Sequence, residues 1–488
     1  MANGGIIGTV NNPTSSTATG VWQQEEQYEA VRDGTWPSRA LFTTKSARFN
    51  DGSSDYLNKT ASAGNRRTFT FSTWLKLSQL TTGRYLFTSW SANNDAGFTY
   101  LAITDGNKIK FAGYGTTYLE TTQLFRDPSA WYHLVLAVDT TSGTANNRCR
   151  IYLNGSEITS FGTRNNPSQN ADLAYNQNSV DLVLGSNNYG GSKGNYFDGY
   201  LAEFIAVDGQ QLAPTSFGVA NSDGVWTPIP YSGTFGTNGF NLQFENAAAL
   251  GTDSSSNGNT FTVNNLTSID QSTDYPENNF ATFNPLDVQA STQTLAEGNL
   301  KVTTDSGGDW DTMASTIGVT SGKWYFEAKL ITLGSNAIIG VIDINDARLN
   351  TTTAYYIGQS TPGCGYQNSG ARPDTGASFG NSYTANDIIG VAIDMDNLKV
   401  YFSKNGTFQN SGNPTSGATG TGAQDLTAST TYSFAISGYA STVWEANFGS
   451  PSYAISSGNA DGNGYGNFEY AVPSGYYSLN TKNLGEFG

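Results

Sequence analysis

The sequence predicts an all-β protein in which two β-sandwiches follow one another, preceded by a short N-terminal anchoring segment. Composition is the first reason: of 488 residues only 13% are charged, 13% are aromatic and 56 are glycine, which is typical of short strands joined by turns. Alternating segments such as 68–77 and 323–330 are the second reason, because period-two hydrophobicity indicates half-buried strands. The third is the pair of Asn-Gly steps at Asn154 and Asn405, each a strong hairpin signal.

Residues 1–40 form the predicted attachment segment. Within it, 21–33 is the best short helix of the chain, ended by Gly34 and kept from continuing by Pro37. A helix of this length is marginally stable alone, so we expect it to dock on another copy or another protein. The predicted attachment or oligomerisation residues are Trp22, Tyr28, Val31 and Trp36.

Residues 41–230 are predicted to form the first sandwich. In 68–77, the side chains of Phe69, Phe71, Leu75 and Leu77 fall on one face, whereas 131–138 is apolar on both faces, as an inner strand would be. Further strands are predicted at 150–154, 180–185 and 200–207.

Residues 231–290 are predicted to be a connector rich in Asn, Ser and Thr. It contains one expected strand at 240–244, and the connector either closes the first sandwich or bridges to the second. A second sandwich is expected over 291–452, followed by a Gly- and Tyr-rich tail over 453–488. Its predicted strands are 323–330, 338–342, 388–393, 398–404, 432–436 and 443–448.

The ordered strand set of the first sandwich resembles the laminin-G-like, or concanavalin-A-like, jelly roll. The matching segments are Phe69–Leu77, Trp131–Val135, Ile151–Gly155, Phe197–Phe204 and Gln211–Thr215. This resemblance implies a rigid scaffold whose loops make the contacts.

The second sandwich resembles a SPRY domain. Gly322–Glu327 matches the opening strand of that family, and Ile339–Val341, Asp394–Gly406 and Asn447–Gly449 match later landmarks. The resemblance implies a further β-sandwich, again with contact-making loops.

Short segments at both ends resemble structural proteins of tailed phages. They are Gly4–Gly8, Gly20–Trp22, Thr35–Pro37 and the Gly/Tyr-rich tail around Pro473–Tyr476. The resemblance implies a virion protein that is assembled in the host cytoplasm and exposed on the particle exterior. It further implies contacts with other virion proteins through the N-terminal segment and a homo-oligomer, with a trimer favoured.

Composition argues against several other classes. The net charge of −16, without a Lys/Arg run, argues against nucleic-acid binding. We expect no membrane insertion, because no apolar stretch reaches the roughly 18 residues that a span needs. The N-terminus lacks a basic region followed by an apolar run, so no secretory signal is predicted. Cys149 and Cys364 lie in different predicted domains, which favours assembly without disulfides in a reducing cytoplasm.

Catalytic residues are not predicted. The one histidine, His133, lies inside an apolar strand and is interpreted as a satisfied structural residue. Glycoside hydrolysis needs two facing carboxylates. Asp394 and Asp396 share a strand face but lie where the SPRY family turns, while Glu203 and Asp208 would point to opposite faces. The acids of Asp309-Trp310-Asp311 are interpreted as a solvated loop around a packed tryptophan.

No cofactor and no metal site are predicted, although a structural Ca²⁺ ion is left open. Loop aspartates supply the hard oxygen ligands that Ca²⁺ prefers, but no spacing resembles an EF-hand loop. The aspartates concerned are Asp95, Asp105, Asp139 and Asp198.

Aromatic residues in polar loops are the candidate ligand-binding residues, because a tyrosine among Asn, Ser and Gly gives a flat apolar surface beside hydrogen-bonding groups. Capping of the sandwich edges is the alternative role. The candidates are Tyr189 and Tyr196, and, in the 350–385 region, Tyr355, Tyr356, Tyr366, Phe379 and Tyr383.

Together these features favour a non-enzymatic virion structural protein, a tail-fibre or spike-type adhesin that binds a host surface glycan or protein through its sandwich loops. A capsid-decorating or head-fibre protein with a packing role is the first alternative. A polysaccharide-degrading enzyme on the same fold is the alternative from another class.

Overall fold

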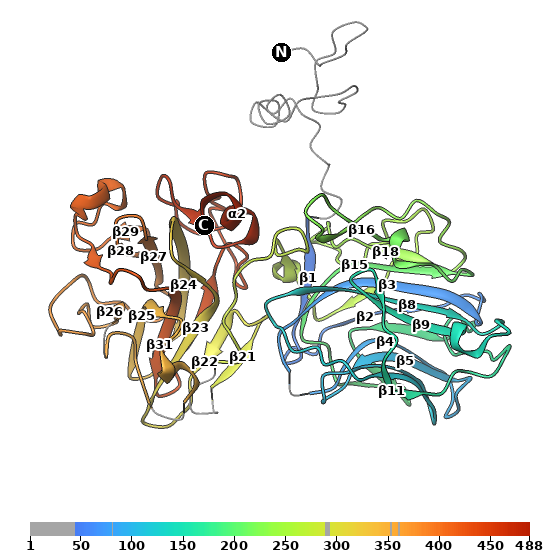
Figure 1. The fold of residues 1–488 in the computed structure, drawn as a ribbon. Coiled ribbons are helices and arrows are strands. Elements are labelled where there is room, and N and C mark those ends of the chain that lie inside the picture. Colours follow the sequence, from blue (N-terminus) through green and yellow to red (C-terminus); the bar gives the residue numbers. More distant parts are fainter. Residues whose placement is uncertain (1–43, 81, 288–292, 352–353, 360–361) are drawn as a thin grey trace, which may run out of the picture. The chain divides into compact units, whose positions relative to one another are not determined.

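A computed structural model describes residues 44–80, 82–287, 293–351, 354–359 and 362–488. Residues 43–488 belong to one compact unit, whose regular secondary structure is almost entirely strands joined by turns and loops (Figure 1). The predicted helix at 21–33 and the attachment residues Trp22, Tyr28, Val31 and Trp36 lie outside the described residues. The predicted fold class is confirmed: the described chain forms two β-sandwiches in series.

Two antiparallel sheets, each of eight described strands, face one another in the first sandwich. The first sheet contains β10 (Ser156–Glu157), β9 (Cys149–Leu153), β8 (Trp131–Asp139), β3 (Thr68–Leu77), β15 (Gly199–Asp208), β1 (Ser46–Phe49) and β20 (Gln271–Ser272) in this order, and β18 (Phe240–Leu242) also pairs with β15. The second contains β11 (Phe161–Arg164), β7 (Thr117–Thr121), β6 (Ile109–Gly113), β5 (Phe98–Ile103), β4 (Arg84–Trp90), β12 (Asp181–Leu184), β2 (Tyr56–Thr60) and β19 (Thr262–Asn264).

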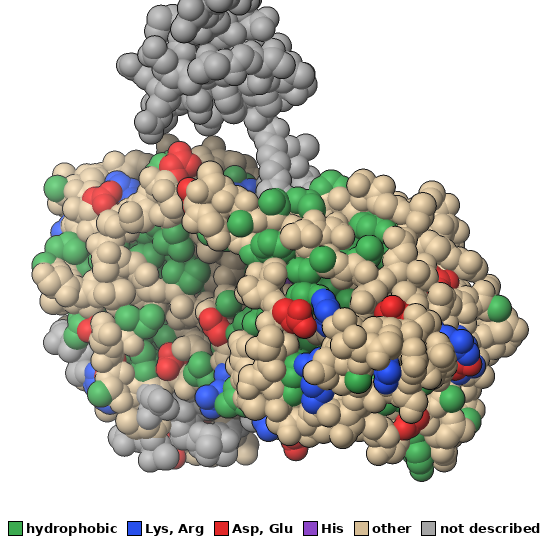
Figure 2. Space-filling model, turned by 45° about the vertical axis from the view of Figure 1, so that its right-hand side comes forward, with side chains coloured by type: hydrophobic (Ala, Val, Ile, Leu, Met, Phe, Trp, Pro, Cys, Tyr) green, Lys and Arg blue, Asp and Glu red, His purple; other side chains and the backbone are tan. Residues whose placement is uncertain are grey.

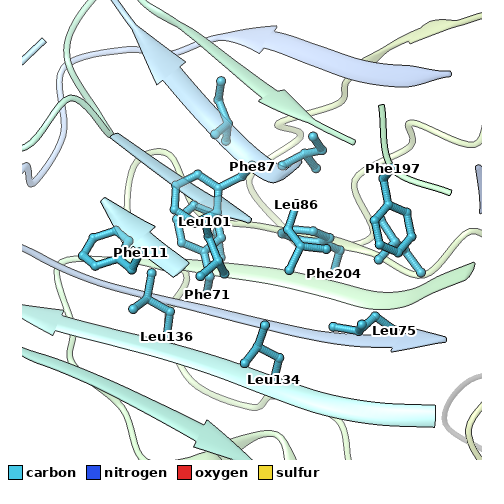
Figure 3. Close-up of a cluster of buried hydrophobic side chains, with 14 of the residues drawn as sticks. Phe71, Leu75, Leu86, Phe87, Leu101, Phe111, Leu134, Leu136, Phe197 and Phe204 are labelled. Atoms are coloured by element: carbon cyan, nitrogen blue, oxygen red, sulfur yellow. The ribbon is translucent and has the colours of Figure 1, made fainter. Parts of the chain in front are cut away.

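The core of the first sandwich lies between these sheets (Figure 3). All four residues predicted for the inner face of 68–77 are in it, and the ring of Phe71 stacks on that of Phe87 from the opposite sheet, with centroids 4.0 Å apart. The Asn154-Gly155 step forms the predicted hairpin turn, since both residues have positive φ angles, 46° and 83°.

Two further hairpins extend from the first sandwich. One is β13 (Asn187–Tyr189) with β14 (Ser192–Gly194), and the other is β16 (Gly218–Ala220) with β17 (Trp226–Pro228). The 3₁₀ turns η1 (Ala145–Asn147), η2 (Pro214–Ser216) and η3 (Ser268–Asp270) join other elements.

The connector 231–290 contributes to both sandwiches. Its strands β18, β19 and β20 pair with β15, β2 and β1 of the first sandwich. Ala281 and Phe283 are buried in the core of the second. Between β20 and Ala281, a fully buried ion pair holds the connector against the first sandwich. Lys76 Nζ lies 2.8 Å from Asp274 Oδ2, and both side chains are 1% exposed.

The second sandwich also has two main sheets. The larger contains β21 (Thr294–Ala296), β22 (Lys301–Thr303), β32 (Val443–Asn447), β24 (Lys323–Thr332), β27 (Ile388–Asp394), β28 (Lys399–Lys404) and β29 (Thr407–Phe408), while β30 (Gln424–Asp425) pairs with β28 and β33 (Tyr477–Ser478) with β24. The smaller contains β23 (Trp310–Val319), β31 (Tyr432–Tyr439), β25 (Asn336–Asp343) and β26 (Gly363–Gln367). The 3₁₀ turns η4 (Ala347–Asn350) and η5 (Pro414–Thr419) lie in its loops, and α2 (Thr481–Phe487) ends the chain.

The outer face of β24 differs from the expectation of a polar, solvent-facing surface. The inner-face residues Trp324, Phe326, Ala328 and Leu330 are in the core as predicted, but Tyr325 and Glu327 on the other face are buried as well. The C-terminal tail covers this face, because Phe468 and Tyr476 pack against Tyr325. Alternation in β24 therefore separates two buried environments.

Within the described residues, no helix is long and apolar enough to cross a membrane.

Candidate functional site

His133 has both ring nitrogens occupied. The indole Nε1–H of Trp226 donates to Nδ1 over 2.9 Å, so Nε2 carries the proton and donates to Ser72 Oγ, 2.8 Å away. Burial lowers the pKa of His133 to about 3, and the ring of Trp74 stacks on it. A neutral imidazole in this tautomer cannot accept a proton from Ser72, so the pair lacks the arrangement of a catalytic dyad.

Asp394 and Asp396, the two acidic residues of the second sandwich that were expected to share a strand face, differ in their surroundings. Asp394 is buried, binds Lys323 Nζ at 2.9 Å and accepts hydrogen bonds from Asn397, so it organises the turn between β27 and β28. Asp396 is exposed and accepts from Gly322 N. In the first sandwich, Asp208 accepts from the backbone nitrogens of Asn65 and Asn238.

Asp311 departs from the expected solvated loop. It is 1% exposed and accepts a hydrogen bond from Asp305 N, and burial raises the pKa of its carboxyl. Asp309 is exposed, and Trp310 packs against Tyr356 and Tyr439 as a packed tryptophan would.

Four of the seven predicted contact residues lie in the protein interior, so the expectation that they form an exposed platform is wrong. Tyr366 on β26 faces the core and donates its hydroxyl to Asn381 O, while the Tyr383 hydroxyl donates to Tyr366 O over 2.8 Å. The region 350–385 looked like one long loop, but it contains a core strand, and its aromatic residues fill the space beside that strand. The buried residues are Tyr355, Tyr366, Phe379 and Tyr383.

The other three predicted residues are differently placed. Tyr356 and Tyr196 are half-buried and pack against Trp310 and Tyr56, with ring centroids 5.0 and 6.3 Å apart. Tyr189, at the tip of the β13–β14 hairpin, is 42% exposed.

Tyr189 forms an exposed tyrosine pair with Tyr114, which is 46% exposed. Their rings are close to parallel, 11° apart with centroids separated by 6.1 Å, and a hydrogen bond between the two hydroxyl groups raises the pKa of Tyr189 because it holds the protonated form of that side chain. The ring of Phe98 supports Tyr189 from below, at 5.9 Å. The pair therefore offers a flat apolar surface in the described part of the molecule. The face drawn in Figure 2 is mostly backbone and uncharged polar side chains, with scattered charged and hydrophobic ones.

Tyr114 was not predicted from the sequence. It lies in the turn between β6 and β7, where the sequence reads Gly113-Tyr114-Gly115. A bulky aromatic residue between two glycines, at a point where neither neighbour can cover it, was the signal that could have identified it.

A pocket of about 470 Å³, lined by both polar and apolar residues, includes Thr116 from the turn that carries Tyr114; we call it the rim pocket. Asp95 joins the two features, because its carboxylate lines the pocket and accepts hydrogen bonds from Gly115 N (2.8 Å) and Thr116 Oγ1 (2.6 Å) in the turn that carries Tyr114. Other polar lining residues are Tyr118, Asn165, Asn166, Ser168 and Asp172.

The aspartates considered for Ca²⁺ do not gather at one place. Asp105 caps its own turn at Gly106 N, Asp139 accepts from Thr141 N, and Asp198 is buried just before β15. Among the described residues, no group of three or more His, Cys, Asp or Glu side chains is placed to hold a metal ion.

Comparison with known protein families agrees with this architecture. Residues 51–210 match the concanavalin A-like lectin/glucanases superfamily, and residues 323–451 match the SPRY domain. The chain thus contains a laminin-G-like, concanavalin A-like domain and a SPRY domain. None of the curated proteins matches the chain.

Solved structures are similar at low levels. The SPRY domain of human HERC1 is 16% identical with a TM-score of 0.26, and the match covers 34% of this chain and 96% of that one. A putative carbohydrate binding protein from Bacteroides ovatus ATCC 8483 is 16% identical with a TM-score of 0.34, covering 46% of this chain and 60% of that one. A SAP-like pentraxin from Limulus polyphemus is 14% identical with a TM-score of 0.25, covering 33% and 71%.

Proposed function

We propose that this chain is a non-enzymatic adhesin, a tail fibre or spike on the exterior of a tailed-phage particle, which binds a host surface glycan or protein through the loops of its first sandwich. The observation that carries the binding role is the exposed, parallel tyrosine pair beside the rim pocket. Parallel aromatic rings next to carboxylate, amide and hydroxyl groups suit a sugar, which presents an apolar ring face and a polar edge.

The virion assignment is supported by the resemblance of the N-terminal and C-terminal segments to tailed-phage proteins. In this proposal the segment 1–40 attaches the chain to other virion proteins and to further copies of itself, with a trimer favoured. The sandwiches then point their loops outward, where the acidic net charge of −16 and the polar surface keep many copies soluble.

Binding is tested with the fluorescently labelled full chain on intact host cells. We expect Tyr114→Ala combined with Tyr189→Ala to lower cell labelling about tenfold or more, because both aromatic rings that form the apolar surface are lost. Val225→Ala is the matched control, since Val225 is exposed (57%) but lies on the separate β16–β17 hairpin. Unchanged labelling by the double variant would remove the tyrosine pair as the contact site.

Particle location is tested by immunogold electron microscopy with an antibody against the chain. Label on the tail is expected. Label spread over the head would contradict the fibre assignment and support capsid decoration.

A further inference from the structure

We propose that the tyrosine pair is one end of a longer row of rings on the outer face of β4 and β5, and that this row binds consecutive sugar units of an extended polysaccharide. This inference rests on the proposed function and adds to it the form of the ligand, a linear chain instead of a single terminal sugar. Three observations carry it: the order of the rings, the β-bulge that turns one of them outward, and the partial exposure of this sheet face.

Four tyrosines and one supporting phenylalanine follow one another in this row; we call it the tyrosine ladder. The rings of Tyr85 and Tyr100 have centroids 5.1 Å apart, and Tyr100 lies 5.2 Å from the buried ring of Phe98. Phe98 supports Tyr189 at 5.9 Å, and Tyr189 pairs with Tyr114 at 6.1 Å. Each step is close to the length of one sugar unit, so successive units of a glycan chain can meet successive rings.

Strand register gives the ladder its direction. Strands β4 and β5 lie side by side (Figure 1), and Tyr85 of β4 is opposite Ala102 of β5. Tyr100 and Phe98 follow on the same face of β5, because alternate residues of a strand share a face and lie about 7 Å apart. Strand β6 ends beside this end of β5, and Tyr114 comes directly after it. The rings therefore run along β5 to the rim where the tyrosine pair lies.

A β-bulge places Tyr85 on the outer face. Tyr85 is opposite Ala102, whereas Phe87 is opposite Leu101, so the register shifts by one residue between them. Phe87 belongs to the core, but Tyr85, two residues earlier, is partly exposed. Simple alternation would have put both rings on the same face, and the bulge redirects one of them. The ladder thus depends on a local irregularity of β4.

The two outer faces of the first sandwich differ in their cover. On the face of β8, Val135 and Ala137 pack with Phe217 in a buried cluster. On β4 and β5, Tyr85 and Tyr100 stay partly exposed, although the β13–β14 hairpin folds against β4. Burial raises the pKa of Tyr85 to about 12 and also raises that of Tyr100. Their hydroxyl groups are therefore protonated at neutral pH and can donate hydrogen bonds to sugar oxygens.

Both ends of the ladder lie at exposed turns. Thr82, before β4, is exposed, and so is Gly115, which follows Tyr114. An extended glycan can therefore continue past the ladder in both directions, as the middle of a polysaccharide must.

The experiment is binding of the full protein to the surface polysaccharide of host cells, partly hydrolysed and separated by length, from single sugar units to fragments longer than the ladder. We expect affinity to rise with length until a fragment spans the ladder, and then to level off. Tyr100→Ala should weaken binding of the long fragments about threefold to tenfold, the range for one stacked aromatic contact, and leave the shortest fragments unchanged. Tyr100→Phe keeps the ring and should keep the affinity. Tyr85→Ala, at the far end, should affect the longest fragments alone.

Tyr56→Ala is the matched control. Tyr56 is half-buried on β2 of the same sheet but packs against Tyr196 instead of the ladder, so this variant should leave the length dependence unchanged. Thermal unfolding of each variant shows whether the fold is retained.

The outcomes separate the inference from the proposed function. Equal affinity for single units and long fragments, or long-fragment binding that is insensitive to both Tyr100→Ala and Tyr85→Ala in folded protein, would overturn the ladder. Cell labelling that still depends on the tyrosine pair would then leave the proposed function intact. Labelling of host cells without binding to any fragment would overturn the glycan ligand and indicate a protein receptor, and loss of both would overturn the proposed function itself.

Discussion

In the first sandwich, hairpin β16–β17 covers the outer face of β8, whereas in the second the C-terminal tail covers the outer face of β24. Each cover is held by hydrogen bonds to one buried titratable side chain. Trp226 of the hairpin donates to His133, and the backbone nitrogens of Glu469 and Tyr470 donate to the carboxylate of Glu327, both over 2.9 Å.

The difference between the two anchors lies in their acid–base chemistry. Burial disfavours the charged form in both cases, but this lowers the pKa of a base and raises the pKa of an acid. The pKa of His133 falls to about 3, and that of Glu327 rises to about 7. The same structural device therefore gives the two sandwiches opposite pH dependence: acid weakens the first cover and alkali weakens the second.

The use of tyrosine separates the sandwiches further, since the first exposes a pair at its rim, whereas Tyr355, Tyr366 and Tyr383 of the second are buried. We expect Tyr366→Ala to lower the free energy of unfolding by about 3–5 kcal/mol, the usual cost of truncating a buried aromatic residue. Chemical denaturation followed by tryptophan fluorescence measures it. A loss below about 1 kcal/mol would contradict the placement of Tyr366 in the core and restore it as a contact candidate.

His133 tests the acid side of the comparison. Its folded-state pKa is lower than the unfolded value, so the unfolded chain binds more protons as pH falls, and stability is lost between about pH 6.5 and pH 3. We expect the free energy of unfolding to fall by about 3 kcal/mol through this group between about pH 7 and pH 4. His133→Gln cannot take up that proton, so the variant should be less stable at neutral pH but less sensitive to acid.

The measurement is a series of denaturation curves at several pH values for the two proteins. If the free energy of unfolding depends equally on pH in the wild type and the variant, His133 does not titrate on unfolding. The proposed acid sensitivity of the first cover would then be wrong.

Glu327 tests the other side. Its folded-state pKa is raised, so the folded chain binds more protons between about pH 4.5 and pH 7, and stability falls as pH rises through this window. We expect the free energy of unfolding to fall by about 2–3 kcal/mol through this group over that pH range. Glu327→Gln removes the titrating group, so the free energy of unfolding should depend less on pH over this range. One backbone N–H of the tail then faces an amide NH₂ group.

Hydrogen exchange of the tail amides of Glu469 and Tyr470 reports this locally. In the wild type their protection should decrease from pH 5.5 to pH 8 after correction for the intrinsic rate, and in the variant the decrease should disappear. Protection that is constant in both proteins would show that Glu327 does not hold the tail through its charge state.

The strand framework could be predicted from the sequence because it depends on local alternation and turn chemistry. Segments such as 68–77 and 323–330 carry their inner faces in their own pattern, and Asn154-Gly155 announces its hairpin. The covers could not be predicted, since Glu327 looks like an outward-facing polar residue until the tail, more than a hundred residues later, folds over it. The prediction of exposed contact residues failed for a related reason. Tyr366 and Tyr189 lie in similar Gly- and Asn-rich sequence surroundings, and only the tertiary fold decides which of them reaches solvent.

Tyr114→Ala gives the smallest expected effect on stability and completes the contrast with Tyr366→Ala. The same substitution of the same residue type should change the free energy of unfolding by less than about 0.5 kcal/mol, because Tyr114 is 46% exposed and is displayed on a turn between two glycines. That turn keeps its own support, since Asp95 binds Gly115 and Thr116 without the tyrosine ring. Denaturation curves of the two variants, measured side by side with cell labelling, separate the roles: Tyr366 acts on stability and Tyr114 on binding. A large loss of stability in Tyr114→Ala would mean that the ring is part of the fold, and the exposed pair would then be an edge cap instead of a contact surface.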